Sequence, residues 1–337
     1  NLNRIAHYRV LVQIFGSVAA QAASIVARNR CVRSAVGIGV LSSEDAERAL
    51  KSFYSDDYMG SFDSIAAAVA VGSALKRALA FGGFELTKFR SNVPTILEGL
   101  REPCQEESRV NVGAADDTAL GIGWDLNRDV FFIRGPSKSV DSPITKRILL
   151  SILMSVYDPL GWVAPFVLPM KLLMQSVSKT HKTATWDDPL PESIQKEAST
   201  CIQSLLYISQ LELPRCYASG LLGEVVSRQL HVLSDGSDRA YGACAYLRQV
   251  DKDGNISTSL VVAKNRIHPS AKKLTVPRSE LAGAVIAAKL KDVVERELEK
   301  PIDRTFLYTD STSNLKYIGN TTRRFQVYVA NRCAEIR

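Results

Sequence analysis

The chain is poor in the residues that build metal cages and disulfide bonds. Its 337 residues include only six cysteines and four histidines. No two cysteines form a Cys-x-x-Cys pair, and none lies at metal-ligand spacing from a histidine, so we do not expect a zinc site. We interpret the thiols as reduced and structural, which is consistent with an intracellular compartment.

Long apolar segments and peptidase signatures are also missing. The longest apolar stretch, residues 65–84, is broken by Lys76 and Arg77, so it is not expected to span a membrane. The N-terminus has neither an initiator methionine nor the layout of a signal peptide, which suggests a fragment or a processed product. No Asp-Thr-Gly, Asp-Ser-Gly or Gly-x-Ser-x-Gly sequence occurs, which argues against peptidase chemistry.

The overall composition is that of a basic globular chain. Hydrophobic residues make up 46% of the sequence and charged residues 23%, as in ordinary folded domains. The length suggests two or three domains. The formal net charge of +7 favours a polyanionic partner, but it is equally compatible with a basic soluble protein that binds no polyanion.

The first two thirds of the chain mix helical and extended patterns. Residues 54–60 place paired acids between aromatic residues and before a glycine, which predicts a strand, a tight turn and a second strand. Residues 102–117 are polar and acidic and form the best candidate linker. Asp158 and Pro159 predict a turn, and Trp186 is expected in a core. Other predicted strands cover residues 4–12, 84–89 and a hairpin at 120–133, and predicted helices cover 19–28, 64–79, 144–174 and 192–211.

From residue 229 onward the pattern predicts a mixed α/β sheet. Asp253 and Gly254 are a hairpin turn signal. Leu281, Val285 and Ala288 share one face of a helix that has a proline near its start. The predicted order is strand, strand, strand, helix, strand, helix, over residues 229–234, 241–249, 256–266, 277–298, 303–310 and 313–318.

Three acids in this last region lie on different predicted elements. Asp235 ends the first strand, Glu280 is in the first turn of the helix, and Asp310 ends the fourth strand. Close carboxylates repel one another unless a cation neutralises them, and oxygen-only ligands suit Mg²⁺ or Mn²⁺. Each acid taken alone is better explained as a helix cap or a surface charge than as a metal ligand.

The sequence around these acids resembles the ribonuclease-H-like domain of BEL/Pao retrotransposons. The resemblance implies that Asp235, Glu280 and Asp310 are catalytic and bind two Mg²⁺ or Mn²⁺ ions that cut RNA in an RNA–DNA hybrid. The family's fourth acid would follow Arg337, so the domain is expected to be incomplete and the chain alone inactive or only weakly active. The matching motifs are Ser234-Asp235-Gly236-Ser237, Ala263-Lys264-Asn265-Arg266, Val276-Pro277-Arg278-Ser279-Glu280-Leu281, Tyr308-Thr309-Asp310-Ser311-Thr312 and Val329-Ala330-Asn331-Arg332.

The upstream sequence resembles the reverse transcriptase of the same elements. Phe53-Tyr54-Ser55-Asp56-Asp57 is similar to the YxDD turn, which implies that Asp56 and Asp57 are catalytic and hold Mg²⁺ with the nucleotide phosphates. Residues 120–125 resemble the hairpin that grips the primer end. Ala19 and Gln21 stand where the family usually has Ser and Pro, which suggests drift. The polymerase's other acid would precede Asn1, so the chain alone is expected to lack polymerase activity.

The resemblance divides this α/β chain into three parts. Residues 1–117 would be the C-terminal part of an α+β palm, 118–226 a thumb and connection, and 227–337 a C-terminally incomplete, mixed-sheet ribonuclease-H-like domain. The implied partners are template RNA, a DNA primer, an RNA–DNA hybrid and other parts of the polyprotein, in a cytoplasmic particle and without a membrane. Two alternatives stay open, an active nuclease and polymerase module or an inactive relic that folds and binds nucleic acid.

Five basic residues lie between two of the matched acids in the sequence. They form either an ordinary solvated basic face or a surface that tracks the phosphates of a hybrid duplex, reading its backbone and 2′-hydroxyls rather than its bases. The five are Lys264, Arg266, Lys272, Lys273 and Arg278.

The phosphate-tracking hypothesis predicts a salt dependence. If about four of these residues contact phosphates, log affinity should fall against log salt with a slope of roughly −3 to −4. The paired change Lys272→Ala and Lys273→Ala should flatten the slope by about two units. Fluorescence anisotropy of a labelled RNA–DNA hybrid across a salt series measures this. An unchanged slope and affinity would leave both lysines as ordinary surface charges.

Overall fold

A computed structural model of the chain describes residues 16, 18–103, 109–112, 122–136, 143–218, 223–270 and 274–337. The chain divides into two compact units, Asn1–Ser108 and Arg109–Arg337. The strand predicted at residues 4–12 lies outside the described residues. No helix in the described part of the chain combines the length and the hydrophobicity needed to cross a membrane.

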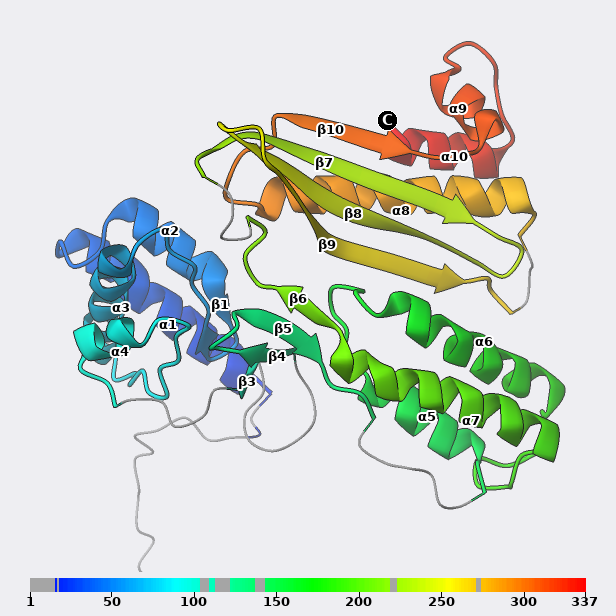
Figure 1. The fold of residues 1–337 in the computed structure, drawn as a ribbon, viewed down its shortest axis with the longest axis horizontal. Helices are drawn as coiled ribbons and strands as arrows, with labels where there is room; N and C mark the ends of the chain where they lie inside the picture. Colours follow the sequence, from blue (N-terminus) through cyan, green and yellow to red (C-terminus); the bar gives the residue numbers. More distant parts are fainter. Residues whose placement is uncertain are drawn as a thin grey trace, which may run out of the picture. The chain divides into compact units, whose positions relative to one another are not determined.

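In the first unit the helices pack on one another, and a short hairpin follows α2 (Figure 1). Serine hydroxyls begin two of the helices, because Ser42 accepts from the backbone N–H of Asp45 and Ser64 from that of Ala67. Buried alanines, valines and leucines of α1, α2 and α3 form its core. The elements are α1 (Ala20–Gly37), α2 (Ser43–Ser52), β1 (Phe53–Tyr54), β2 (Asp57–Tyr58), α3 (Ile65–Ala80) and α4 (Pro94–Leu100).

Two predictions from the sequence are wrong, a strand in the first unit and a buried tryptophan in the second. Residues 84–89 form no strand, because Lys88 adopts a left-handed φ of 57° that ends an extended run. Trp186, expected in a core, is 47% exposed in the second unit. Its backbone carbonyl rather than its ring is the anchor there, since it accepts from the N–H of Arg147.

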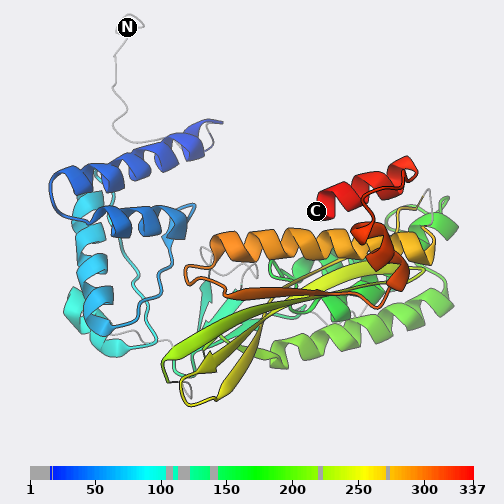
Figure 2. The ribbon, with the colours of Figure 1, turned by 90° about the horizontal axis from the view of Figure 1, so that it is seen from above.

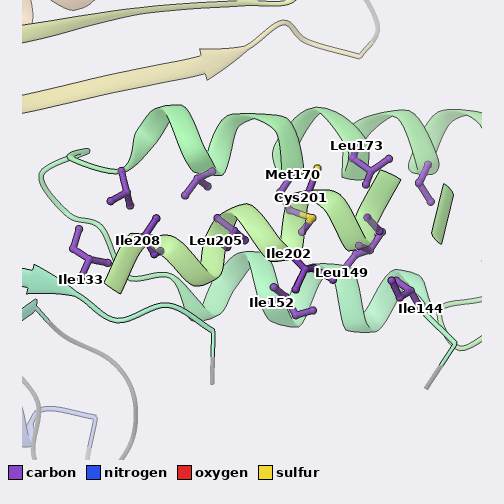
Figure 3. Packing of buried hydrophobic residues seen from close by; sticks show 14 of the residues in the cluster. Ile133, Ile144, Leu149, Ile152, Met170, Leu173, Cys201, Ile202, Leu205 and Ile208 are labelled. Atoms are coloured by element: carbon purple, nitrogen blue, oxygen red, sulfur yellow. The ribbon is translucent and has the colours of Figure 1, made fainter. Parts of the chain in front are cut away.

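The second unit begins with an antiparallel sheet and three helices. The sheet order is β3-β4-β5-β6, and β4 and β5 form the hairpin predicted around Leu126. The helices enclose a core that includes Leu149, Met170 and Ile202 (Figure 3). The elements are β3 (Arg109–Val112), β4 (Ile122–Asp125), β5 (Val130–Ile133), α5 (Lys146–Ser155), α6 (Ala164–Thr180), α7 (Glu192–Leu206) and β6 (Glu212–Pro214).

A second four-stranded sheet of this unit has the order β10-β7-β8-β9. Strand β10 is parallel to β7 and the other pairs are antiparallel, which gives the mixed sheet that the sequence predicted. Helix α8 runs along one face (Figure 2) and buries Ile286, Ala287 and Leu290 against β7 and β8. The elements are β7 (Val225–Gly236), β8 (Ala240–Asp251), β9 (Ile256–Ile267), α8 (Val276–Glu297), β10 (Arg304–Tyr308), α9 (Thr312–Gly319) and α10 (Val327–Ile336).

The turn predicted at Asp158 attaches the α6 segment to strand β9. The carboxylate of Asp158 accepts from the backbone N–H groups of Trp162 and Val163, each at 2.9 Å. The N–H of Ala263 donates to Leu160 O at 2.7 Å, and the Trp162 indole donates to the carbonyl of Val261 at 3.2 Å. These bonds satisfy backbone groups on the outer edge of β9, which would otherwise be an open sheet edge.

Gly161 permits this attachment, and replacing it with any residue that has a Cβ should destabilise the fold. It has a φ of 73°, and a Cβ there would lie 1.8 Å from the carbonyl oxygen of Ala263. Gly161→Ala should therefore reduce the free energy of unfolding by at least about 2 kcal/mol, as measured by urea denaturation. Gly254 also has a left-handed φ, 83°, but has open space around it. Gly254→Ala should cost only about 1 kcal/mol, and equal losses in the two variants would contradict the contact.

Candidate active site

Two of the three expected acids lie at the ends of adjacent parallel strands, Asp235 in the last residues of β7 and Asp310 just after β10. The register pairs Leu233 of β7 with Tyr308 of β10, and the Ser234 hydroxyl donates to the carbonyl of Tyr308 at 3.1 Å. Parallel strands end at the same edge of a sheet, so Asp235 and Asp310, each two residues beyond this pair, lie at that edge. Both side chains are exposed.

Helix α8 brings the third acid, Glu280, to the same corner. A Cβ on Gly236 would lie 2.4 Å from the backbone nitrogen of Glu280, and a Cβ on Gly283 would lie 2.6 Å from Asp235 O. The helix therefore touches the end of β7 backbone to backbone, directly beside Asp235. Glu280 is half-buried. The sequence analysis did not single out Gly283, although a glycine inside a helical pattern is a signal of close packing.

The electrostatic surroundings leave these carboxylates available to a cation. In the part of the chain that the structure describes, no ion pair involves Asp235, Glu280 or Asp310. One oxygen of Asp235 accepts from the backbone N–H of Gly236 at 2.6 Å. Among the described residues, no three His, Cys, Asp or Glu side chains are already grouped closely enough to hold a metal ion. The donor chemistry and the backbone positions suit a hard divalent cation, while the side chains are not closed around one point.

Of the basic residues expected near these acids, two are exposed on β9, one is half-buried on α8, and two lie outside the described residues. Lys264 and Arg266 are exposed on β9, while Lys272 and Lys273 lie outside the described residues. Arg278 is half-buried, with its guanidinium 5.4 Å from the centre of the Tyr328 ring on α10. Arg278 therefore packs α8 against α10, a role that the sequence did not indicate.

In the first unit, Asp56 and Asp57 lie on the predicted hairpin. Strands β1 and β2 pair antiparallel, with Tyr54 opposite Asp57. Ser55 adopts a left-handed φ of 51° in the turn. Arg28 of α1 donates to the carbonyl of Ser55, so the hairpin lies beside the helix as expected. Both acids are exposed.

The two neighbouring acids of the hairpin influence each other electrostatically. Desolvation and then the charge of Asp56 raise the pKa of the Asp57 carboxyl, and Lys88 partly offsets both effects. A group whose pKa is raised by folding destabilises the folded state when it is ionised, because the unfolded state releases the proton more easily. Such an acid pair is a candidate for cation binding.

Part of the second unit is similar in sequence to a ribonuclease-H-like domain. Residues 145–311 match the family model described as the Pao retrotransposon-like RNaseH-like domain. The matched residues make up just under half of the chain, whose fold is α/β as the sequence predicted. No curated protein matches the sequence.

Solved structures with detectable similarity are distant. RNase H1 from the halophilic archaeon Halobacterium salinarum NRC-1 is 15% identical, with a TM-score of 0.22, over 32% of this chain and 74% of that one. The foamy viral protease-reverse transcriptase dRH in complex with ds DNA is 15% identical, with a TM-score of 0.45, over 87% and 46%. The foamy viral protease-reverse transcriptase in complex with dsDNA is 12% identical, with a TM-score of 0.20, over 79% and 50%. The chain spans about half the length of these two viral proteins.

The raised pKa of Asp57 predicts a pH-dependent gain from its neutralisation. At pH 7 the ionised carboxylate is unfavourable in the folded state, so Asp57→Asn should raise the melting temperature. The gain should stay within about 1 kcal/mol because the group is exposed, and it should disappear near pH 3, where Asp57 is protonated in both states. Thermal unfolding at the two pH values measures it, with exposed Glu85→Gln as the control. A gain that is the same at both pH values would contradict the electrostatic cause.

Proposed function

We propose that residues 227–337 form a metal-dependent ribonuclease H that cuts the RNA strand of RNA–DNA hybrids. The observation that supports the proposal is the backbone placement of Asp235, Glu280 and Asp310, which the strand register and the α8–β7 contact put near one corner of the sheet. The three acids come from three separate elements, and none is used in an ion pair within the described residues. Acids that only stabilise a fold are usually paired or act as caps, so their availability favours a site for a cation.

In this proposal each residue at the corner has a defined task. Asp235, Glu280 and Asp310 would hold Mg²⁺ or Mn²⁺. The bound ions would activate a water and stabilise the leaving oxygen of the phosphodiester. Lys264 and Arg266 lie on β9, two strands away from the β7 end, and are exposed to phosphates of a duplex. Contacts with the backbone and the 2′-hydroxyl would select RNA without reading its bases.

The first unit would contribute to RNA-templated DNA synthesis in the full-length protein. Asp56 and Asp57 would bind Mg²⁺ and, through it, the phosphates of the incoming nucleotide. The hairpin is suited to this because Arg28 and Gln21 both donate to Ser55 at its turn, which fixes the two acids beside α1. Template RNA, a DNA primer and other parts of the polyprotein would be the partners, in a cytoplasmic particle.

A second candidate is an inactive relic that folds and binds nucleic acid. The observation that favours it is the absence, among the described residues, of a ready-made group of three metal-binding side chains. Under this alternative the basic surface would still bind a hybrid, but divalent ions would not bind at the acids.

Cleavage of a hybrid separates the two candidates. The nuclease proposal predicts cleavage of a labelled RNA strand with Mg²⁺ or Mn²⁺, and a loss of at least about a hundredfold in Asp235→Asn, Glu280→Gln or Asp310→Asn. Asp253→Asn, which changes an exposed acid in the β8–β9 turn, should have no effect. Hybrid binding with neither metal-dependent cleavage nor Mn²⁺ binding that these three changes weaken would support the relic, and cleavage that survives all three changes would contradict the site.

A further inference from the structure

The start of helix α8 is anchored by tertiary contacts rather than by its own cap. Its N-cap residue, Thr275, makes no side-chain capping hydrogen bond, and proline occupies the first helical turn. A helix start without a side-chain cap leaves backbone donors unsatisfied and its first turn loosely held. Glu280 lies immediately after this turn, so its position depends on whatever else holds the helix start.

A buried hydrogen bond holds this turn from one side. Ser279, which directly precedes Glu280, is fully buried, and His268 is 4% exposed. Ser279 Oγ lies 2.7 Å from His268 Nε2 and 3.4 Å from the carbonyl oxygen of Ala240. Either ring tautomer preserves the pair, because the hydroxyl can donate to the ring nitrogen or accept from it. A polar pair in so dry a position is costly to break.

His268 is itself held by groups from other elements. Its backbone N–H donates to the carbonyl of Arg239 at 3.0 Å. Its carbonyl accepts from Gln175 Nε2 of α6 at 2.6 Å. Lys171 of the same helix donates to Asn265 Oδ1 at 3.2 Å, so α6 is bonded to the end of β9 at two points. A continuous chain of hydrogen bonds thus runs from α6 through His268 to the residue before Glu280.

We infer that Gln175, His268 and Ser279 are positioning residues that orient Glu280 for metal binding. The inference rests on the proposed function, because it assigns Glu280 to the metal site. Gly236 and Gly283 set how closely α8 approaches β7, and the buried face of α8 fixes the rotation of the helix as a whole. The Ser279 hydrogen bond holds the uncapped first turn itself, because it joins one side chain of that turn to a buried ring. It acts on Glu280 through the backbone of the turn, and outer hydrogen bonds that orient a metal ligand typically tune metal affinity.

Three variants break the chain at successive points. Ser279→Ala removes the hydroxyl, His268→Leu removes the ring nitrogen, and Gln175→Ala removes the donor from α6. His268→Gln is the conservative variant, since the glutamine amide nitrogen reaches about as far from the backbone as imidazole Nε2 does. Ser178→Ala is the matched control on α6, because Ser178 is exposed and its hydroxyl bonds only to the carbonyl of Met174.

The test is a titration of the whole chain with Mn²⁺. Electron paramagnetic resonance measures the free Mn²⁺, at a temperature below the melting temperature of every variant. Glu280→Gln is the reference for loss of a ligand. His268→Leu and Ser279→Ala should weaken binding about tenfold. Gln175→Ala should weaken it less, and His268→Gln should restore most of the affinity. Ser178→Ala should bind as the unchanged protein does.

The outcomes separate the inference from the proposed function. If Glu280→Gln weakens binding but His268→Leu and Ser279→Ala do not, the positioning role is wrong and the metal site stands. If Glu280→Gln leaves binding unchanged, Glu280 is not a ligand, and both the site and the inference fall. If His268→Gln binds as poorly as His268→Leu, the ring acts by filling space rather than through its hydrogen bond, which also overturns the inference.

Discussion

The contact between α8 and the end of β7 is the constraint on which the candidate site depends. Gly236 approaches the backbone of Ser279 and Glu280, and Gly283 approaches that of Asp235, so closely that no side chain fits at either glycine. Because the helix touches the strand here, Glu280 lies beside Asp235 rather than a side-chain layer away from it. The parallel pairing of β10 with β7 then adds Asp310 at the same edge. Backbone packing therefore selects which acids meet.

Other acids of the same unit show what a structural carboxylate looks like. Asp251 is buried and accepts from Asn255, Gly223 and Asp253, and these bonds lower its pKa, the Asn255 side chain most of all. Asp125 likewise accepts from the backbone of Arg128, the largest cause of its lowered pKa, and pairs with Arg109. Asp310 makes no comparable bond among the described residues, and Asp235 accepts only from its own neighbour. Asp235 and Asp310 thus differ from the structural carboxylates Asp251 and Asp125 in having few hydrogen-bond donors bound to them.

Much of the ribonuclease-H-like sheet could be predicted from the sequence, because its signals are local. The Asp253-Gly254 turn fixes the β8–β9 hairpin, and the spacing of apolar residues in α8 defines its buried face. The hairpin at Asp56 was predictable for the same reason. By contrast, the helix predicted over residues 144–174 forms two helices, α5 and α6, and Pro165 lies in the first turn of α6, where a proline is well tolerated.

The rest could not be predicted because it depends on contacts between residues far apart in the chain. Nothing near Gly161 indicates that its neighbours bond to β9, about a hundred residues later. His268 appeared in the sequence as one of four scattered histidines, and only the fold places it against Ser279. Lys88 ends an extended run through a left-handed backbone that its residue type does not indicate. The pairing of α6 with β9 is thus a property of the folded unit.

The central claim is that Asp235, Glu280 and Asp310 share a divalent cation at the corner formed by β7, β10 and α8. The most direct measurement is anomalous diffraction from crystals of the chain soaked in MnCl₂. The account predicts Mn²⁺ density within bonding distance, about 2 to 2.5 Å, of oxygens from at least two of these carboxylates. Mn²⁺ density at other positions in the crystal and none at these carboxylates, with the carboxylates turned away from one another, would contradict the claim.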